Sequence, residues 1–169
     1  MKKFNYCPNH KADEAYMANM CHKGFAAKSL VEGVWTFEPC EPDEYTFRVC
    51  YLRGKSDAEI EKLKSDLAAK QIEFVSRYSF WAIFRSKRDF RLYTEEQELE
   101  ICRAIRRPMI FGSFLCPIYF GLLVLSAAKL CKWLFIPAAV FAAYGAMCIF
   151  LCTSYTRLIK KLTDKRKEG

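Results

Sequence analysis

The stretch "GVWTFEPCEPDEYTFRVCYL", residues 33–52, carries aromatic side chains on both sides of an acidic, proline-marked turn. The rings recur at every second position, at Trp35, Phe37, Tyr45, Phe47 and Tyr51. Because successive side chains of a strand point to opposite faces, this period of two predicts two strands with one aromatic face each. We expect the strands to form a hairpin whose rings all lie on the covered face of an antiparallel sheet.

In this hairpin the turn spans Glu38 to Glu44, so that Phe37 pairs with Tyr45 and Trp35 with Phe47. A slip of one residue in the register would divide the rings between both faces of the sheet. We therefore expect the register that keeps the rings on one face, and we expect two helices to cover that face. The opposite face then carries polar side chains. Our candidate binding residues are on that side or in nearby strands: Arg48, Thr46 and Lys28.

Helix signals precede and follow the hairpin. An apolar i, i+4 pattern predicts a helix over residues 11–24, with Gly24 as its left-handed C-cap. Ser56 and Glu59 form a capping box, and we expect Ile60, Leu63 and Leu67 to be the buried stripe of the second helix. Further strands are expected at 2–7, 25–31, 72–78 and 80–86, and a third helix at 94–107.

The pattern of helix, strand, turn and Trp-centred strand occurs twice. Residues 23–27 align with 70–74 at an offset of 47, and residues 35–37 align with 81–83 at an offset of 46. The element order approximates βαββαβ. The expected fold class is therefore α+β, a ferredoxin-like, internally duplicated antiparallel sheet with helices on one face, followed by a transmembrane helical hairpin.

Two uncharged runs dominate the C-terminal part, residues 109–128 and 133–156. They contain 20 and 24 residues, and a helix needs about 20 to cross a hydrocarbon core of about 30 Å. Only "KLCK" separates them, which predicts two membrane passes, at about 109–128 and 133–155. The expected divisions are an α+β domain at 1–98, a basic juxtamembrane helix at 99–107, the two membrane helices within 108–156, and a basic tail at 157–169.

The net charge of +8 is concentrated around these runs. Residues 1–100 hold 16 basic and 17 acidic residues, whereas residues 101–169 hold 11 basic and 2 acidic ones. Three basic residues precede the first run and six follow the second, against Lys129 and Lys132 in the loop, so both termini are expected in the cytoplasm. This distribution disfavours a nucleic-acid partner. The residues expected to contact anionic lipid headgroups are Arg103, Arg106, Arg107, Lys160 and Lys161.

Small residues four apart, Ala138, Ala142 and Ala146, offer a face for close helix packing and a possible route to a homo-oligomer. Nine cysteines are scattered through the chain, four of them in or beside the apolar runs. Because a cytoplasmic domain keeps its thiols reduced, free cysteines are the expectation.

At the level of motifs, residues 2–98 resemble the bacterial DUF2812 family. The similarity lies in the initial "KKF", the helix ending before Gly24, the segment "WTFE…EPDEYTFRVCYL" and the later "LYTE". Where the family commonly has a Gly-Trp pair after each helix, this sequence has Gly24-Phe25 and Gln71-Ile72. The resemblance implies no activity. It implies C-terminal membrane helices and, through neighbouring PadR-type regulator genes, a bacterial regulatory setting.

Few residues suggest chemistry. Cys7, His10, Cys21 and His22 are metal-ligand types, but adjacent Cys21 and His22 do not easily face one tetrahedral zinc, so no metal or other cofactor is expected. A Cys-His nucleophile from the same residues lacks an orienting partner. The acidic turn is expected to be solvated.

Two classes of function follow. The first is a membrane-anchored, non-enzymatic interaction or sensory module, whose cytoplasmic domain binds a protein partner or a small ligand. The second is a membrane-associated enzyme whose active site the sequence does not identify. A third alternative, an RNA-binding sheet, is suggested only by the faint similarity of "YTFRVCYL" to an aromatic RNA-binding strand.

Overall fold

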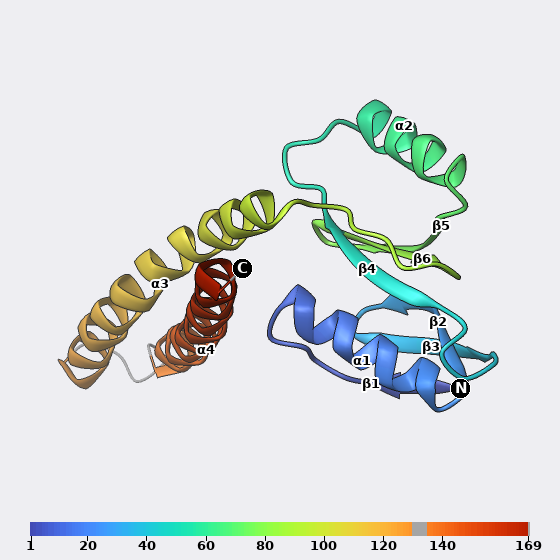
Figure 1. Cartoon of the computed structure of the whole chain (residues 1–169). Coiled ribbons are helices and arrows are strands. Elements are labelled where there is room, and N and C mark those ends of the chain that lie inside the picture. The colour runs from blue at the N-terminus through green and yellow to red at the C-terminus, as the bar shows by residue number, and fades with distance from the viewer. Residues whose placement is uncertain (130–134, 169) are drawn as a thin grey trace. The chain divides into compact units, whose positions relative to one another are not determined.

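The computed structural model describes residues 1–129 and 135–168, in two compact units, Met1–Leu92 and Tyr93–Gly169 (Figure 1). The first unit contains helices and antiparallel strands and confirms the α+β class. Its elements are β1 (Lys2–Phe4), α1 (His10–His22), β2 (Phe25–Val31), β3 (Val34–Pro39), β4 (Thr46–Tyr51), α2 (Asp57–Ala68), β5 (Glu73–Tyr78) and β6 (Trp81–Ser86). Apart from β1, which ends three residues before the predicted strand 2–7, each lies within two residues of a predicted element.

The strands form two three-stranded sheets, with orders β1-β3-β2 and β4-β6-β5, in place of the single predicted sheet. The predicted pairing of β3 with β4 is wrong. Both edges of β3 are occupied, by β1 and by β2, so β4 has no free edge to join there and pairs with β6 instead. Phe37 therefore pairs with Ala27 and Phe47 with Arg85.

The aromatic face is nonetheless buried. Trp35 and Phe37 from the first sheet and Phe47 and Val49 from the second share one core, each 2 % exposed or less. The helical residues in this core come from α1, which packs against both β2 and β4. The rings thus lie under α1 and between the sheets, rather than under both helices. Figure 1 shows α1 beside β4 and the first sheet, with α2 on the β5 side.

One offset, 47 residues, relates the two halves of this unit. The strand pairs Lys2–Thr36 and Leu30–Trp35 correspond to Val49–Ile83 and Arg77–Ala82. The helix N-caps Asn9 and Ser56 also correspond, as do the positive-φ residues Gly24 and Gln71 and the residues next to the two register shifts, Ser29 and Ser76. Each half is a βαββ unit in which the last strand is central. Trp35 is therefore equivalent to Ala82, and the predicted alignment of Trp35 with Trp81 is off by one residue.

Helix α2 begins with the predicted capping box, in which Ser56 and Glu59 satisfy each other's backbone N–H groups. Ile60 and Leu67 are buried, as predicted, but Leu63 is only half-buried. Among the described strands, helix α2 packs mainly against β5, at the edge of its sheet. A helix that covers a sheet edge leaves part of its inner stripe in contact with solvent.

The second unit consists of two long helices, α3 (Glu95–Lys129) and α4 (Phe135–Glu168). Thr94 and Gln97 cap α3 reciprocally, as the sequence predicts. Contrary to prediction, Pro108 does not open a new helix: α3 runs through both Pro108 and Pro117. A proline removes one backbone donor, and apolar helices tolerate this loss because neighbouring groups satisfy the freed carbonyl. The predicted loop residue Lys132 and Trp133 lie outside the described residues.

Helices α3 and α4 pack as an antiparallel hairpin. An added methyl group on Gly112 would lie 2.9 Å from the Cys148 sulfur, and one on Gly145 would lie 3.0 Å from Cys116 Cβ. The two helices therefore approach closely where a glycine of one helix faces a cysteine of the other. Ala138 is buried, whereas Ala142 and Ala146 are exposed, so the predicted alanine face is divided. Large apolar side chains such as Phe111 and Phe114 are about 70 % exposed, and both helices are long and apolar enough to cross a membrane.

Candidate functional site

An open groove of about 720 Å³ lies beside the C-terminal half of α2 in the first unit. Its walls come from α2, from the start of β5 and from the segment after β6. The side chains that give it its character are Tyr45, Lys64, Gln71, Phe74, Lys87 and Arg88. None of these six was among the predicted binding residues.

Ser86 connects two walls of the groove. This buried hydroxyl donates to the carbonyl of Gln71 at 3.1 Å and accepts from the backbone N–H of Arg88 at 3.2 Å. Gln71 has a φ of +62°, the left-handed conformation that ends α2 and turns the chain into β5. Ser86, at the end of β6, thereby joins the segment that follows α2 to the segment that carries Arg88.

Aromatic rings and cations alternate along the groove. The Lys64 ammonium lies 4.3 Å from the centroid of the Phe74 ring, and the Lys87 ammonium lies 5.8 Å from that of Tyr45. Lys87 also pairs with Glu44 at 2.9 Å, and this hydrogen bond raises the Lys87 pKa. Within the part of the chain that the structure describes, the Arg88 guanidinium has no ion-pair partner. The groove can therefore hold negative charge beside an apolar surface.

The first half shows what the same place looks like when it is filled. At the offset of 47, Lys64, Ala68 and Lys87 are equivalent to Met17, Cys21 and Cys40. Met17 and Cys21 are buried, and the sulfurs of Cys21 and Cys40 lie 3.8 Å apart. In the second half, a cation, a smaller side chain and a second cation take these places. The groove is thus open where the internal repeat is packed.

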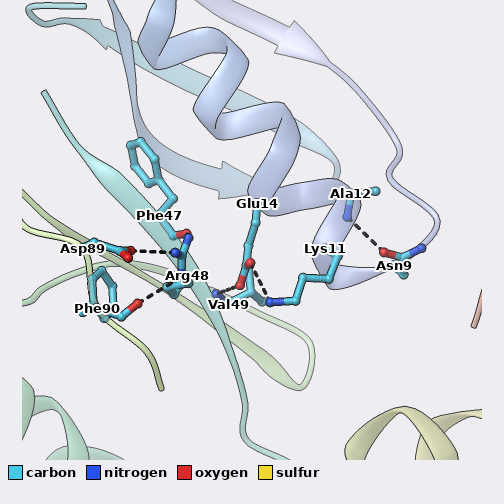
Figure 2. Close-up of polar contacts among 9 residues, drawn as sticks. All are labelled: Asn9, Lys11, Ala12, Glu14, Phe47, Arg48, Val49, Asp89 and Phe90. Carbon is cyan, nitrogen blue, oxygen red and sulfur yellow. Dashed lines mark hydrogen bonds and ion pairs between the residues drawn. The ribbon is translucent and has the colours of Figure 1, made fainter. Parts of the chain in front are cut away.

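The predicted binding residue Arg48 serves an internal contact (Figure 2). Its guanidinium donates to the Phe90 carbonyl at 3.1 Å, the Phe47 carbonyl at 2.9 Å and the Asp89 carboxylate at 2.8 Å. The bonds to Phe90 and Asp89 fix the segment between β6 and α3 to the second sheet, whereas the bond to Phe47 stays within β4. All three donor nitrogens are used, so Arg48 is a clamp in this structure.

Figure 2 also shows how β4 is held against α1. The Glu14 carboxylate accepts from the Val49 N–H at 2.9 Å and from the Lys11 ammonium at 3.1 Å. The edge of the second sheet is thus capped by a side chain of the first helix.

Of the other two predicted binding residues, Thr46 shares strand β4 and one face of the second sheet with Arg48, whereas Lys28 is on β2 in the first sheet. Thr46 pairs with Ser86 across the sheet. Lys28 sits at the register shift of β2, 3.5 Å from Glu38, and lines a smaller pocket of about 150 Å³ that shares Phe74 with the groove. The structure therefore does not gather the three predicted residues into one site.

The possible metal ligands lie at opposite ends of α1. Cys7 and His10 are near its start, where His10 is buried and stacked on Trp81. Cys21 and His22 are near its end, where His22 pairs with Asp43 at 2.9 Å. Burial, with the nearby Asp13 carboxylate, raises the pKa of the Cys7 thiol to about 12. A thiol that stays protonated at neutral pH is a poor nucleophile.

The residues predicted to contact lipid lie where the start of α3 meets the end of α4. Arg103, Arg107, Lys160 and Lys161 are exposed, and Arg106 is half-buried. Each helix is about 50 Å long, which exceeds the hydrocarbon core by about 20 Å. The basic ends therefore extend beyond the apolar segments.

A family model described as "Protein of unknown function (DUF2812)" matches residues 9–111, more than half of the chain. No curated protein and no solved structure matches this chain. The match covers α1 and everything from there to the first part of α3, including the groove. Of the aromatic side chains in the matched strands β3 and β4, Trp35, Phe37 and Phe47 are buried, whereas Tyr51 is partly exposed.

Proposed function

We propose, from the premise that this chain belongs to the DUF2812 family, that it is a membrane-anchored, non-enzymatic sensory or interaction module. The proposal rests on one observation. A unit with its own core and an open, basic groove is joined in one chain to two long helices whose large apolar side chains are exposed. Such a surface is unfavourable in water and favourable in hydrocarbon.

In this proposal both termini are cytoplasmic in a bacterial cell. Nine basic residues flank the ends of the hairpin that carry the termini, against two in the connecting loop. Residues 95–107 and 157–168 are the parts of α3 and α4 beyond the apolar segments. Their exposed basic side chains contact anionic headgroups. The partner or ligand of the α+β unit then comes from the cytoplasm. The resemblance to a regulator-linked family agrees with a sensory role.

The repeat at one offset supports a second element of the proposal, that the two βαββ halves arose by duplication. In a duplicated domain one copy can retain a packed interior while the other diverges into a binding site. The helix of the first half, α1, packs into the common core, whereas the groove lies beside the helix of the second half, α2. Divergence of the second copy would account for an open groove beside α2 at the place where Met17 and Cys21 are buried beside α1.

Reporter fusions test the anchoring. Alkaline phosphatase is active only outside the cytoplasm, and green fluorescent protein is fluorescent only inside it. Each reporter is fused separately to the N-terminus and to the C-terminus, and alkaline phosphatase is also inserted between Lys129 and Lys132. We expect fluorescence at both termini and phosphatase activity only in the loop insertion. Extraction by carbonate from isolated membranes serves as the control for peripheral association. Phosphatase activity at either terminus, or release by carbonate, would overturn the proposal.

A further inference from the structure

We propose that the groove beside α2 binds a small organic anion that has a flat apolar body, such as an aromatic phosphate or carboxylate. This inference deepens the proposed function, because it rests on a sensory unit and names the class of its ligand. It starts from the groove's size: about 720 Å³ lies within the range of small-molecule sites.

The charges around the groove favour an anion. Lys64, Lys87 and Arg88 border it, and Glu73 is the acidic residue in its lining. Glu73 is already engaged, since it accepts a hydrogen bond from Arg85 at 2.8 Å. Lys64 and Lys87 pair with exposed or partly exposed glutamates, and such surface pairs are weak enough for a ligand anion to replace them. Arg88 needs no such exchange and can receive a phosphate or carboxylate with two parallel hydrogen bonds.

The apolar part of the lining favours a flat body. Ile72 is buried at the base of the groove, and the Phe74 and Tyr45 rings remain partly exposed in its walls. Cations already lie over both rings, Lys64 over Phe74 at 4.3 Å and Arg85 over Tyr45 at 4.6 Å. A planar guest would stack on the ring surface that these cations leave exposed. A simple inorganic ion would leave this apolar surface in contact with water.

The internal repeat argues that the groove is a specific feature. The equivalent space in the first half is closed by the buried Met17 and Cys21. Placing a lysine and an alanine at these positions gives up apolar burial, which lowers the stability of the second half. A binding site gives this loss a function, because the same two replacements create both the space and one of its cations.

Calorimetric titration tests the proposal with the full chain in phosphatidylcholine nanodiscs, which contain no anionic lipid. The probe is 2-naphthyl phosphate. Inorganic phosphate and 2-naphthol are the matched charge-only and body-only probes, and protein-free nanodiscs give the reference. We expect saturable binding of 2-naphthyl phosphate, at least about tenfold tighter than either matched probe.

Variants locate the site. Arg88→Gln should weaken 2-naphthyl phosphate by about tenfold, the effect of losing one charge-assisted contact. Lys64→Met combined with Ala68→Cys, the residues of the first half, should abolish binding. Lys62→Gln, on the same helix but outside the groove lining, is the control and should leave affinity unchanged. Circular dichroism of each variant checks folding, and Arg88→Gln keeps the test decisive should the double variant not fold.

Three outcomes would overturn the proposal: no saturable heat above protein-free nanodiscs, inorganic phosphate binding as tightly as 2-naphthyl phosphate, or Lys62→Gln weakening the probe as much as Arg88→Gln. Incorporation into nanodiscs is measured separately. A chain that inserts but binds no probe refutes the ligand class alone, whereas a chain that does not insert refutes the anchoring.

Discussion

The Glu38 carboxylate accepts a hydrogen bond from the Arg85 guanidinium at 2.8 Å, and the two residues occupy equivalent positions in the two halves of the first unit. Equivalent residues meet when two copies of one motif face each other across an approximate twofold axis. Here one copy carries the acid and the other the base. The same seam carries Ser76, whose hydroxyl accepts a hydrogen bond from the N–H of Leu30 at 3.2 Å.

Replacing Glu38 with Gln should lower the free energy of unfolding by about 0.5–1 kcal/mol. The cost is modest because Glu38 is one-third exposed and Arg85 keeps its bond to Glu73. Asp66→Asn, an exposed change on α2, is the control. Urea unfolding of the full chain in mild detergent gives the values, and equal midpoints for Glu38→Gln and the native chain would refute a stabilising seam.

The same pair predicts a pH dependence. The hydrogen bond from Arg85 lowers the Glu38 pKa below its usual range. A carboxyl whose pKa is lowered by folding stabilises the fold above its unfolded pKa, and this contribution is lost as the pH falls through the folded pKa. The difference in stability between the native chain and Glu38→Gln should therefore be full at neutral pH and vanish in acid. A difference that grows on acidification would contradict this assignment.

Helix α2 offers a second test, because its stripe is buried unevenly. Ile60 is 2 % exposed, whereas Leu63 is half-buried. We expect Ile60→Ala to cost about 2–5 kcal/mol of unfolding free energy, and Leu63→Ala clearly less, since a partly exposed side chain leaves a smaller cavity. The same urea melts measure both. Equal losses at the two positions would mean that α2 lies closer to the sheet than this structure shows.

Much of the first unit could be predicted from sequence because its signals are local. The Glu32-Gly33 turn, with positive φ at both residues, and the reciprocal Ser56–Glu59 cap depend only on residues near in sequence. The pairing of β3 with β4 could not be predicted, because alternation reveals which face of a strand is covered but not which strand lies beside it. The short strand β1 takes the edge of β3 that the hairpin would have needed.

The candidate site escaped prediction for a related reason. Arg48 stands out in the sequence as a cation on an apolar strand, and the structure uses it as a clamp. Lys64 and Lys87 resemble ordinary surface lysines until the repeats are aligned at 47. In that alignment Lys64 is equivalent to the buried Met17, and Lys87 is equivalent to the half-buried Cys40. The sequence signal for the groove is therefore the difference between the two repeats at an offset of 47. Aligning the tryptophans at an offset of 46 hides this difference.

The Arg48 clamp can be tested by hydrogen exchange. Replacing Arg48 with Gln removes the ion pair with Asp89 and the hydrogen bond to the Phe90 carbonyl, the two contacts through which Arg48 holds the segment between β6 and α3. We expect amide exchange in peptides covering residues 87–92 to increase several-fold, while peptides from α1 remain unchanged. Arg53→Gln is the matched control, since Arg53 stacks on Phe80 away from this segment. Unchanged exchange at 87–92 would show that other contacts hold it.

The last prediction concerns the aromatic face, through Trp35. Its indole is 1 % exposed and contacts the rings of Tyr16 and Phe37, with centroids 5.8 and 6.1 Å away. In the Trp81→Phe, Trp133→Phe background, Trp35 should emit at short wavelength and resist quenching by iodide and acrylamide. Burial under α1 requires this, because the emission of an indole shifts to the red when water can relax around it.

A matched variant keeps Trp81 instead, in the Trp35→Phe, Trp133→Phe background. Trp81 is half-buried and stacked on His10, so its emission should be redder and more easily quenched than that of Trp35. The order of the two residues carries the argument, since both belong to the first unit and sit in central strands. If Trp35 is the more accessible, the two sheets do not enclose a common core, and the aromatic strands become the better candidate for a ligand surface than the groove beside α2.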